Sequence, residues 1–73
     1  MLAEQRQSVI LAMVNQRGSL SITEIQRKLK VSRETIRRDL MLLADRNALR
    51  KAYGGALSLE RSEPDSALAL GIR

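Results

Sequence analysis

The sequence predicts a winged helix-turn-helix, a mainly α-helical fold of three helices and a small two-stranded β-hairpin, the wing. Three observations predict it: apolar residues at helical spacing in three successive segments, a gap of about three residues between the second and third segments, and paired glycines between two short strand-like runs. The 73 residues allow one small domain. Hydrophobic residues make up 44% and include one aromatic residue, Tyr53, so an aliphatic core is expected.

The first helix is predicted from Leu2 to Gln16. Its apolar stripe, with residues three to four positions apart, consists of Leu2, Val9, Ile10, Met13 and Val14. Gly18 follows as a C-terminal stop, because glycine adopts a left-handed backbone without steric cost. Leu20 then lies in a short extended link that leaves room for a strand of one or two residues.

The second helix is predicted from Ile22 to Leu29, with Ile22, Ile25 and Leu29 facing the core. Ser21 and Glu24 form a capping box, in which the hydroxyl accepts from the Glu24 amide and the carboxylate accepts from the Ser21 amide. Lys30 and Val31 form the turn that follows. The segment therefore has its own start and stop signals.

The third helix is predicted from Arg33 to Arg46, and Ser32 is its N-terminal cap. Ile36, Leu40 and Leu43 are its core stripe, because Leu40 and Leu43 each lie within about 40° of Ile36 on a helical wheel. Asn47 stands where the chain leaves the helix, and asparagine tolerates the left-handed conformation better than most residues do.

The wing is predicted from two strands, Leu49–Tyr53 and Ala56–Leu59, joined by a turn at Gly54-Gly55. An isolated hairpin is only marginally stable, so its apolar residues must pack on the helices. Leu49 and Leu57 are the expected anchors. The pattern ends at Glu60: residues 60–66 are polar, and residues 67–72 are a short apolar stretch.

Charge is concentrated in one third of the chain. The net charge is +5, and nine of the 13 basic residues but only three of the eight acidic residues lie between Arg27 and Lys51. This concentration indicates either an acidic partner or a basic face that aids solubility.

Composition also disfavours most other functions. The chain has no histidine and no cysteine, which disfavours metal sites, disulfides and most catalysis. We therefore expect no catalytic residue, metal or cofactor, and no small-molecule site in this chain. No apolar run approaches the roughly 18 residues of a membrane span, and no secretion signal is present. No membrane partner and a cytoplasmic location are predicted.

The outward face of the third helix suits the major groove of double-stranded DNA. Arg33 and Arg37 are assigned to base edges, because a planar guanidinium can bridge the paired acceptors of guanine. Glu34 is a candidate acceptor from cytosine. A helix N-terminus also presents free amides to phosphates. Phosphate contacts are predicted for Ser32, Thr35 and Arg38.

The predicted wing carries a second set of candidates, Lys51, Tyr53 and Gly54, for the flanking groove or backbone of the DNA. Structural roles stand beside these assignments: Tyr53 as a packing residue, Gly54 as a turn residue and Ser32 as a cap. Asp39 points away from its neighbour Arg38 and is expected to pair with a basic residue elsewhere in the chain.

One run of residues resembles a known family. Val31-Ser32-x-x-Thr35-Ile36-Arg37-Arg38-Asp39-Leu40, followed by Arg50 and then Gly54-Gly55-Ala56, is similar to the DeoR-type helix-turn-helix signature. The resemblance covers residues 3–58, with the helix-turn-helix at 20–39. Tyr53 stands where the family commonly has histidine before the paired glycines.

The resemblance implies a bacterial transcription regulator, usually a repressor of sugar uptake or catabolism genes that is released by a phosphorylated sugar bound to a C-terminal domain. Residues 1–59 would be the DNA-binding domain, and residues 60–73 a linker or the start of that C-terminal effector domain, which the chain lacks. The full-length regulator is expected to be a dimer or higher oligomer, and this fragment a monomer.

Sequence-specific binding of an operator in double-stranded DNA is the leading hypothesis. The alternative is a winged-helix protein-interaction module without specific DNA binding, since a fold does not dictate function. The clustered arginines argue against it, because the centres of protein interfaces are depleted in charge. RNA binding is disfavoured by the single aromatic residue. An enzyme is least expected.

Overall fold

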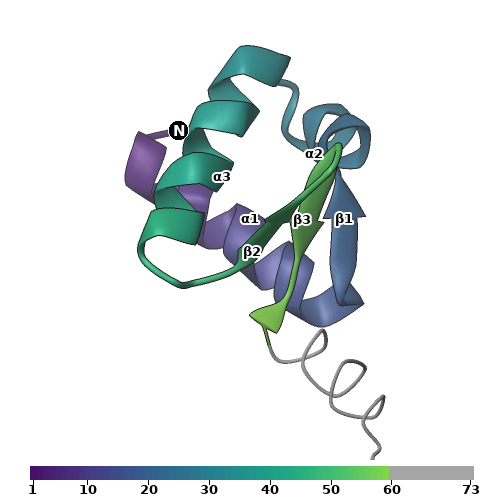
Figure 1. Cartoon of the computed structure of the whole chain (residues 1–73). Coiled ribbons are helices and arrows are strands. Elements are labelled where there is room, and N and C mark those ends of the chain that lie inside the picture. Colours follow the sequence, from purple (N-terminus) through teal and green to yellow (C-terminus); the bar gives the residue numbers. More distant parts are fainter. Residues whose placement is uncertain (60–73) are drawn as a thin grey trace, which may run out of the picture.

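The structure, a computed structural model that describes residues 1–59, has the element order of a winged helix-turn-helix (Figure 1). Its elements are α1 (Ala3–Arg17), β1 (Ser19–Ser21), α2 (Ile22–Leu29), α3 (Arg33–Asp45), β2 (Arg50–Ala52) and β3 (Gly55–Leu57). The predicted fold class is confirmed. The predicted linker and apolar stretch within 60–73 lie outside the described residues.

Helix ends form where the capping residues predict them. The Ser21 hydroxyl accepts from the Glu24 amide at 3.1 Å, and the Glu24 carboxylate accepts from the Ser21 amide at 3.1 Å, which completes the capping box. Asn47 has φ 60° after α3, as expected. Lys30 also adopts a left-handed conformation, with φ 57°, and this turns the chain between α2 and α3.

The sheet has three antiparallel strands in the order β1-β3-β2, one more than the predicted hairpin. The extended link at Leu20 is a full strand, and Leu20 pairs with Ala56 at the centre of the β1–β3 ladder. This pairing covers one edge of the hairpin and joins it to the start of α2. A hairpin that is marginal alone is thereby built into the domain.

The predicted position of the hairpin turn was wrong by one residue. Ala52 pairs with Gly55, so the two turn residues are Tyr53 and Gly54, and Gly54 has the positive φ of 75° that the turn requires. Gly55 lies in β3 instead. A Cβ atom there would lie 2.3 Å from the carbonyl oxygen of Leu20, so Gly55 is needed for close approach of two strands rather than for a turn.

The core is aliphatic, as predicted, and lies between the helices and one face of the sheet. Its buried members are Ile10, Val14, Leu20, Ile22, Ile25, Ile36, Leu40, Leu43, Leu49 and Ala56. Figure 1 shows α1 crossing behind α3 and the strands. Helix α1 therefore contributes Ile10 and Val14 to a core that it shares with α3 and with the sheet.

Three side chains predicted to face the core do not. Leu57 is only half-buried, because alternation at the end of β3 places Ala56 and the following residue, Ser58, inward instead. Leu2 and Val9 are exposed, since the buried face of α1 is the narrow row Gln7, Ile10 and Val14. Leu49 is buried and anchors the hairpin, as expected.

Candidate nucleic-acid interface

The N-terminus of α3 is capped by Ser32. Its hydroxyl oxygen accepts from the Thr35 amide at 3.2 Å and donates to the Thr35 hydroxyl at 2.9 Å. Both predicted phosphate-binding hydroxyls therefore lie together at the start of the helix, next to its free amides. The capping role of Ser32 is confirmed, and the exposed position of its side chain leaves the hydroxyl accessible to a ligand.

The three arginines of the predicted interface face solvent. Arg33, Arg37 and Arg38 are exposed, and within residues 1–59 none of them forms an ion pair with a carboxylate. Glu34 is exposed on the same turn. Within residues 1–59 these guanidinium groups are therefore not held in ion pairs by the protein's own carboxylates, and a polyanion can approach them directly.

A groove of about 380 Å³ brings α3 and the wing together. Arg33 and Arg37 line it from the helix, and Lys51, Tyr53 and Gly54 line it from the hairpin; Ile22 and Ala52 complete the lining. The Tyr53 side chain is fully exposed, so the packing role considered for it is wrong. Five of the nine predicted site residues share this groove; the other four, Ser32, Glu34, Thr35 and Arg38, lie along α3 outside it.

A main-chain hydrogen bond holds the wing against the helix-turn-helix. The Gly54 carbonyl oxygen accepts from the Ile22 amide at 2.8 Å. Ile22 is the first residue of α2, and its amide is one of those that a helix leaves without an internal partner. The same bond therefore satisfies a helix end and fixes the position of the turn beside α3.

Asp39, the residue after Arg38, is paired on the opposite side of the helix. It is buried, and its carboxylate accepts hydrogen bonds from Nε and Nη2 of Arg6 and from the Gln7 amide nitrogen, the last at 3.0 Å. The predicted structural pairing of Asp39 with a distant basic residue is confirmed. Burial raises the pKa of Asp39, but these hydrogen bonds and the charge of Arg6 outweigh burial and leave the pKa below its ordinary value.

Sequence reasoning did not identify Arg6 and Gln7 as the partners of Asp39. Gln7 lies three residues before Ile10 and seven before Val14, on the buried face of α1, so a polar residue interrupts an apolar row there. That interruption was the available signal, because a buried amide needs a hydrogen-bonding partner from another element.

Among the residues that the structure describes, no group of three or more acidic side chains is placed to hold a metal ion. No helix within residues 1–59 is both long enough and apolar enough to cross a membrane.

Comparison with known proteins gives a family match over most of the chain. Residues 6–62 match the DeoR-like helix-turn-helix domain. Similar proteins include an uncharacterized HTH-type transcriptional regulator, YulB, of Bacillus subtilis, which is 38% identical over 65 residues covering 89% of this chain and 25% of that protein. No solved structure gives a significant match.

Two further relatives have names that state their roles. The L-fucose operon activator of Haemophilus influenzae is 45% identical over 73% of this chain and 21% of its own length. The lactose phosphotransferase system repressor of Streptococcus mutans is 41% identical over 80% of this chain and 23% of its own. The chain thus spans about a quarter of the length of these relatives. It belongs to the DeoR-like helix-turn-helix family and contains the DNA-binding domain of that family.

Proposed function

We propose that the protein binds a specific sequence of double-stranded DNA by inserting α3 into the major groove, as part of a transcription regulator. The observation that carries the proposal is the shared groove, where Arg33 and Arg37, which form no ion pair with a carboxylate of residues 1–59, lie beside Lys51 at the wing. A major groove admits one helix, and the neighbouring phosphate backbone is attracted to basic side chains beside it.

The residues of α3 have separate roles in this proposal. Arg33 and Arg37 contact base edges, and Glu34 accepts from cytosine. Ser32, Thr35 and Arg38 hold phosphates at the N-terminal half of the helix, where the free amides add to the attraction. Phosphate contacts set the register of the protein on the duplex, whereas base contacts select the sequence.

The wing contacts the DNA beside the major-groove site. Lys51 neutralises a backbone phosphate, and Tyr53 and Gly54 approach the flanking groove. These contacts are supported by the position of the three residues, which are exposed on the hairpin and line the same groove as Arg33 and Arg37. Tyr53 can donate a hydrogen bond from its hydroxyl.

The regulated genes belong to sugar uptake or catabolism in this proposal, and the protein is a cytoplasmic repressor. The printed roles of the relatives, in lactose and L-fucose systems, support the sugar connection. Residues 1–59 form the DNA-binding domain, and the following segment leads to an effector domain that binds a phosphorylated sugar and releases the DNA.

Tight operator binding requires two copies on paired half-sites. A single module of this size buries about 600–1,000 Å² of protein surface on DNA. As a monomer, the 73-residue chain therefore binds with a Kd of roughly 10⁻⁴ to 10⁻⁶ M at physiological salt. The dimer or higher oligomer forms in the full-length regulator.

Selection from a library of random-sequence duplexes, followed by titration, tests the function. We expect enrichment of one sequence pattern and binding to the recovered duplex that weakens steeply with salt. A chain that enriches no pattern and shows no salt-sensitive DNA binding would be the protein-interaction module instead. Nanomolar binding by a monomeric sample would contradict the requirement for paired half-sites.

A further inference from the structure

The contact between α1 and α3 bears on how the DNA sequence is selected, an inference that rests on the function proposed above. Asp39 is 2% exposed and lies two residues after Arg37 and one after Arg38. Arg6 binds both oxygens of its carboxylate, and Gln7 adds a third hydrogen bond to Oδ1. Three directional bonds therefore join α1 to the half of α3 that carries the interface.

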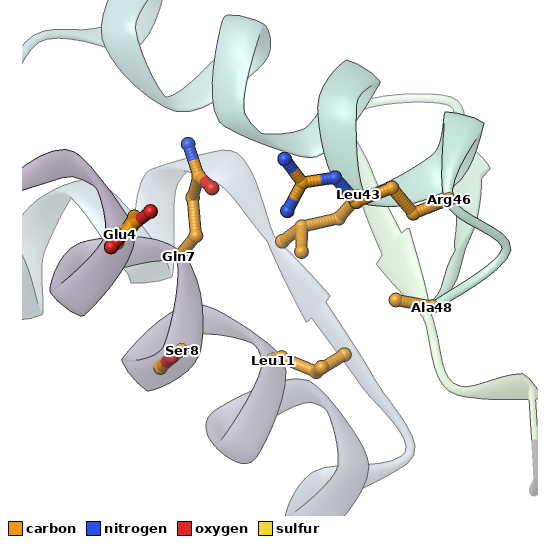
Figure 2. Close-up of a pocket in the computed structure, with 7 residues that line it drawn as sticks. All are labelled: Glu4, Gln7, Ser8, Leu11, Leu43, Arg46 and Ala48. Carbon is orange, nitrogen blue, oxygen red and sulfur yellow. The ribbon is translucent and has the colours of Figure 1, made fainter.

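Apolar packing alone leaves the position of α3 weakly specified. Apart from Asp39, the inward side chains of the helix are aliphatic. Aliphatic cores lose a unique arrangement of their elements before they lose stability. A second hollow, also about 380 Å³, lies between α1 and the C-terminal end of α3. Figure 2 shows Leu11 and Leu43 across this hollow, with Gln7 rising from α1 toward α3 beside it. Toward α1, the C-terminal end of α3 thus borders an open hollow, although Leu43 itself is buried.

We propose that the contact of Arg6 and Gln7 with Asp39 is a positioning device that sets the rotation of α3 and so the sequence preference of the domain. A guanidinium paired side-on with a carboxylate fixes distance and angle together, which an apolar contact does not. Rotation of α3 about its axis would move the Arg33 and Arg37 side chains away from the base edges.

This device affects specific binding more than non-specific binding. A guanidinium pairs with guanine only in a narrow geometry, whereas attraction to phosphates tolerates small shifts of the helix. Loss of the contact therefore lowers the ratio of specific to non-specific affinity and leaves the salt dependence unchanged. A contact that served only to stabilise the fold would leave that ratio unchanged in any folded variant.

The main test is Arg6→Lys in the full chain, with Arg17→Lys as the matched control. Lysine keeps the charge but cannot bind both carboxylate oxygens in a fixed plane. Arg17 is also on α1 and forms an exposed ion pair with Glu24, at 3.4 Å, so the control makes the same exchange away from α3. Binding is measured to the duplex that the parent chain recovers from a random library and to a scrambled duplex of equal length.

A double variant, Arg6→Met with Asp39→Leu, removes the contact without leaving one charge buried alone. Replacing a buried ion pair by apolar residues is often neutral for stability, and Gln7 borders the open hollow, where water can satisfy its amide. Circular dichroism and thermal melting confirm which variants are folded at the binding temperature.

The expected result is a fall of about tenfold in the affinity ratio for the double variant, in line with the loss of one well-aligned base contact, and a smaller fall for Arg6→Lys. Arg17→Lys keeps the parent ratio. The proposal is overturned if folded Arg6 variants keep the parent ratio, or if both affinities fall by the same factor. Failure of the proposed function is a separate outcome, since the parent chain itself would then recover no sequence.

Discussion

The wing and α3 face the same groove, yet they are held in place by different kinds of bond. The wing is fixed by main-chain hydrogen bonds, in the β1–β3 ladder and from Ile22 to Gly54. Helix α3 is fixed by side chains, through its aliphatic stripe and the contact of Asp39 with α1. Main-chain bonds depend little on side-chain identity. We therefore expect substitutions to destabilise the wing where a new side chain would block the approach of two backbones, and to displace α3 where they remove one of its own side-chain contacts.

Gly55→Ala is predicted to have the largest effect on the wing. The new Cβ would lie 2.3 Å from the Leu20 carbonyl oxygen and 2.9 Å from the Ser21 Cα, so β1 and β3 must separate. The expected loss is about 3 kcal/mol of unfolding free energy, the upper end for overpacking in a rigid site. Urea unfolding of the variant and the parent measures it.

Gly54→Ala is the matched control for that variant. Its Cβ would meet no atom within 4 Å, but its φ of 75° disfavours a side chain. The expected cost is about 1 kcal/mol. Equal losses at the two glycines would mean that close strand approach does not hold the wing.

The fold was predictable from the sequence because each helix carries local signals. The caps at Ser21 and Ser32 and the left-handed exit at Asn47 depend on short-range chemistry. The third strand was underestimated because it depends on the pairing of Leu20 with Ala56, residues that are distant in sequence. The turn was misplaced because Gly55 was assigned to it, whereas Gly55 is needed for close approach to Leu20. Local patterns do not encode that register.

For the candidate site, too, the features set by local helical geometry were predictable and those set by tertiary packing were not. Helical geometry places the arginines on the outward face of α3, and their exposure agrees with it. The sequence also indicated that Asp39 needs a basic partner, but it offers 13 basic residues and no way to select Arg6 among them. The choice depends on how α1 crosses α3, which is a property of tertiary packing.

Arg37→Ala tests whether a side chain of α3 selects the DNA sequence. Loss of a guanidinium at a base edge is expected to cost about 1–3 kcal/mol of binding free energy and to relax the preference at one base pair. Arg46→Ala removes the same charge just beyond the other end of α3 and should leave the preferred sequence unchanged. Selection from random duplexes with each variant gives both results. An unchanged preference in Arg37→Ala would remove that residue from the base contacts.

Acid is predicted to weaken the contact between α1 and α3 while it leaves the ladder of the wing intact. The pKa of Asp39 is below its ordinary value when the protein is folded, so its charge stabilises the fold above the unfolded pKa of about 3.9. This stabilisation is lost as the pH falls through the lower folded pKa. We expect the parent to exceed Asp39→Asn by about 1–2 kcal/mol near neutral pH, the difference between charge-assisted and neutral hydrogen bonds.

The advantage of the parent over Asp39→Asn should shrink as the pH falls below the unfolded value, because protonation makes the two side chains alike in charge. Thermal unfolding of both chains across the acid range measures this difference, and the other carboxylates cancel because both chains contain them. A difference that stays constant with pH would show that the contact depends on shape rather than on charge.

Lys51→Ala is expected to have the smallest effect and separates the two elements most clearly. Because Lys51 is exposed on β2 while the ladder is formed by the main chain, its removal should leave the fold and the preferred sequence unchanged. If it neutralises one phosphate, all duplexes should bind somewhat more weakly, and the slope of log affinity against log salt should decrease by about one. Lys28→Ala removes the same charge from α2, outside the groove between α3 and the wing, and should leave the slope unchanged. A Lys51 variant that alters the preferred sequence would mean that the wing, like α3, contacts bases.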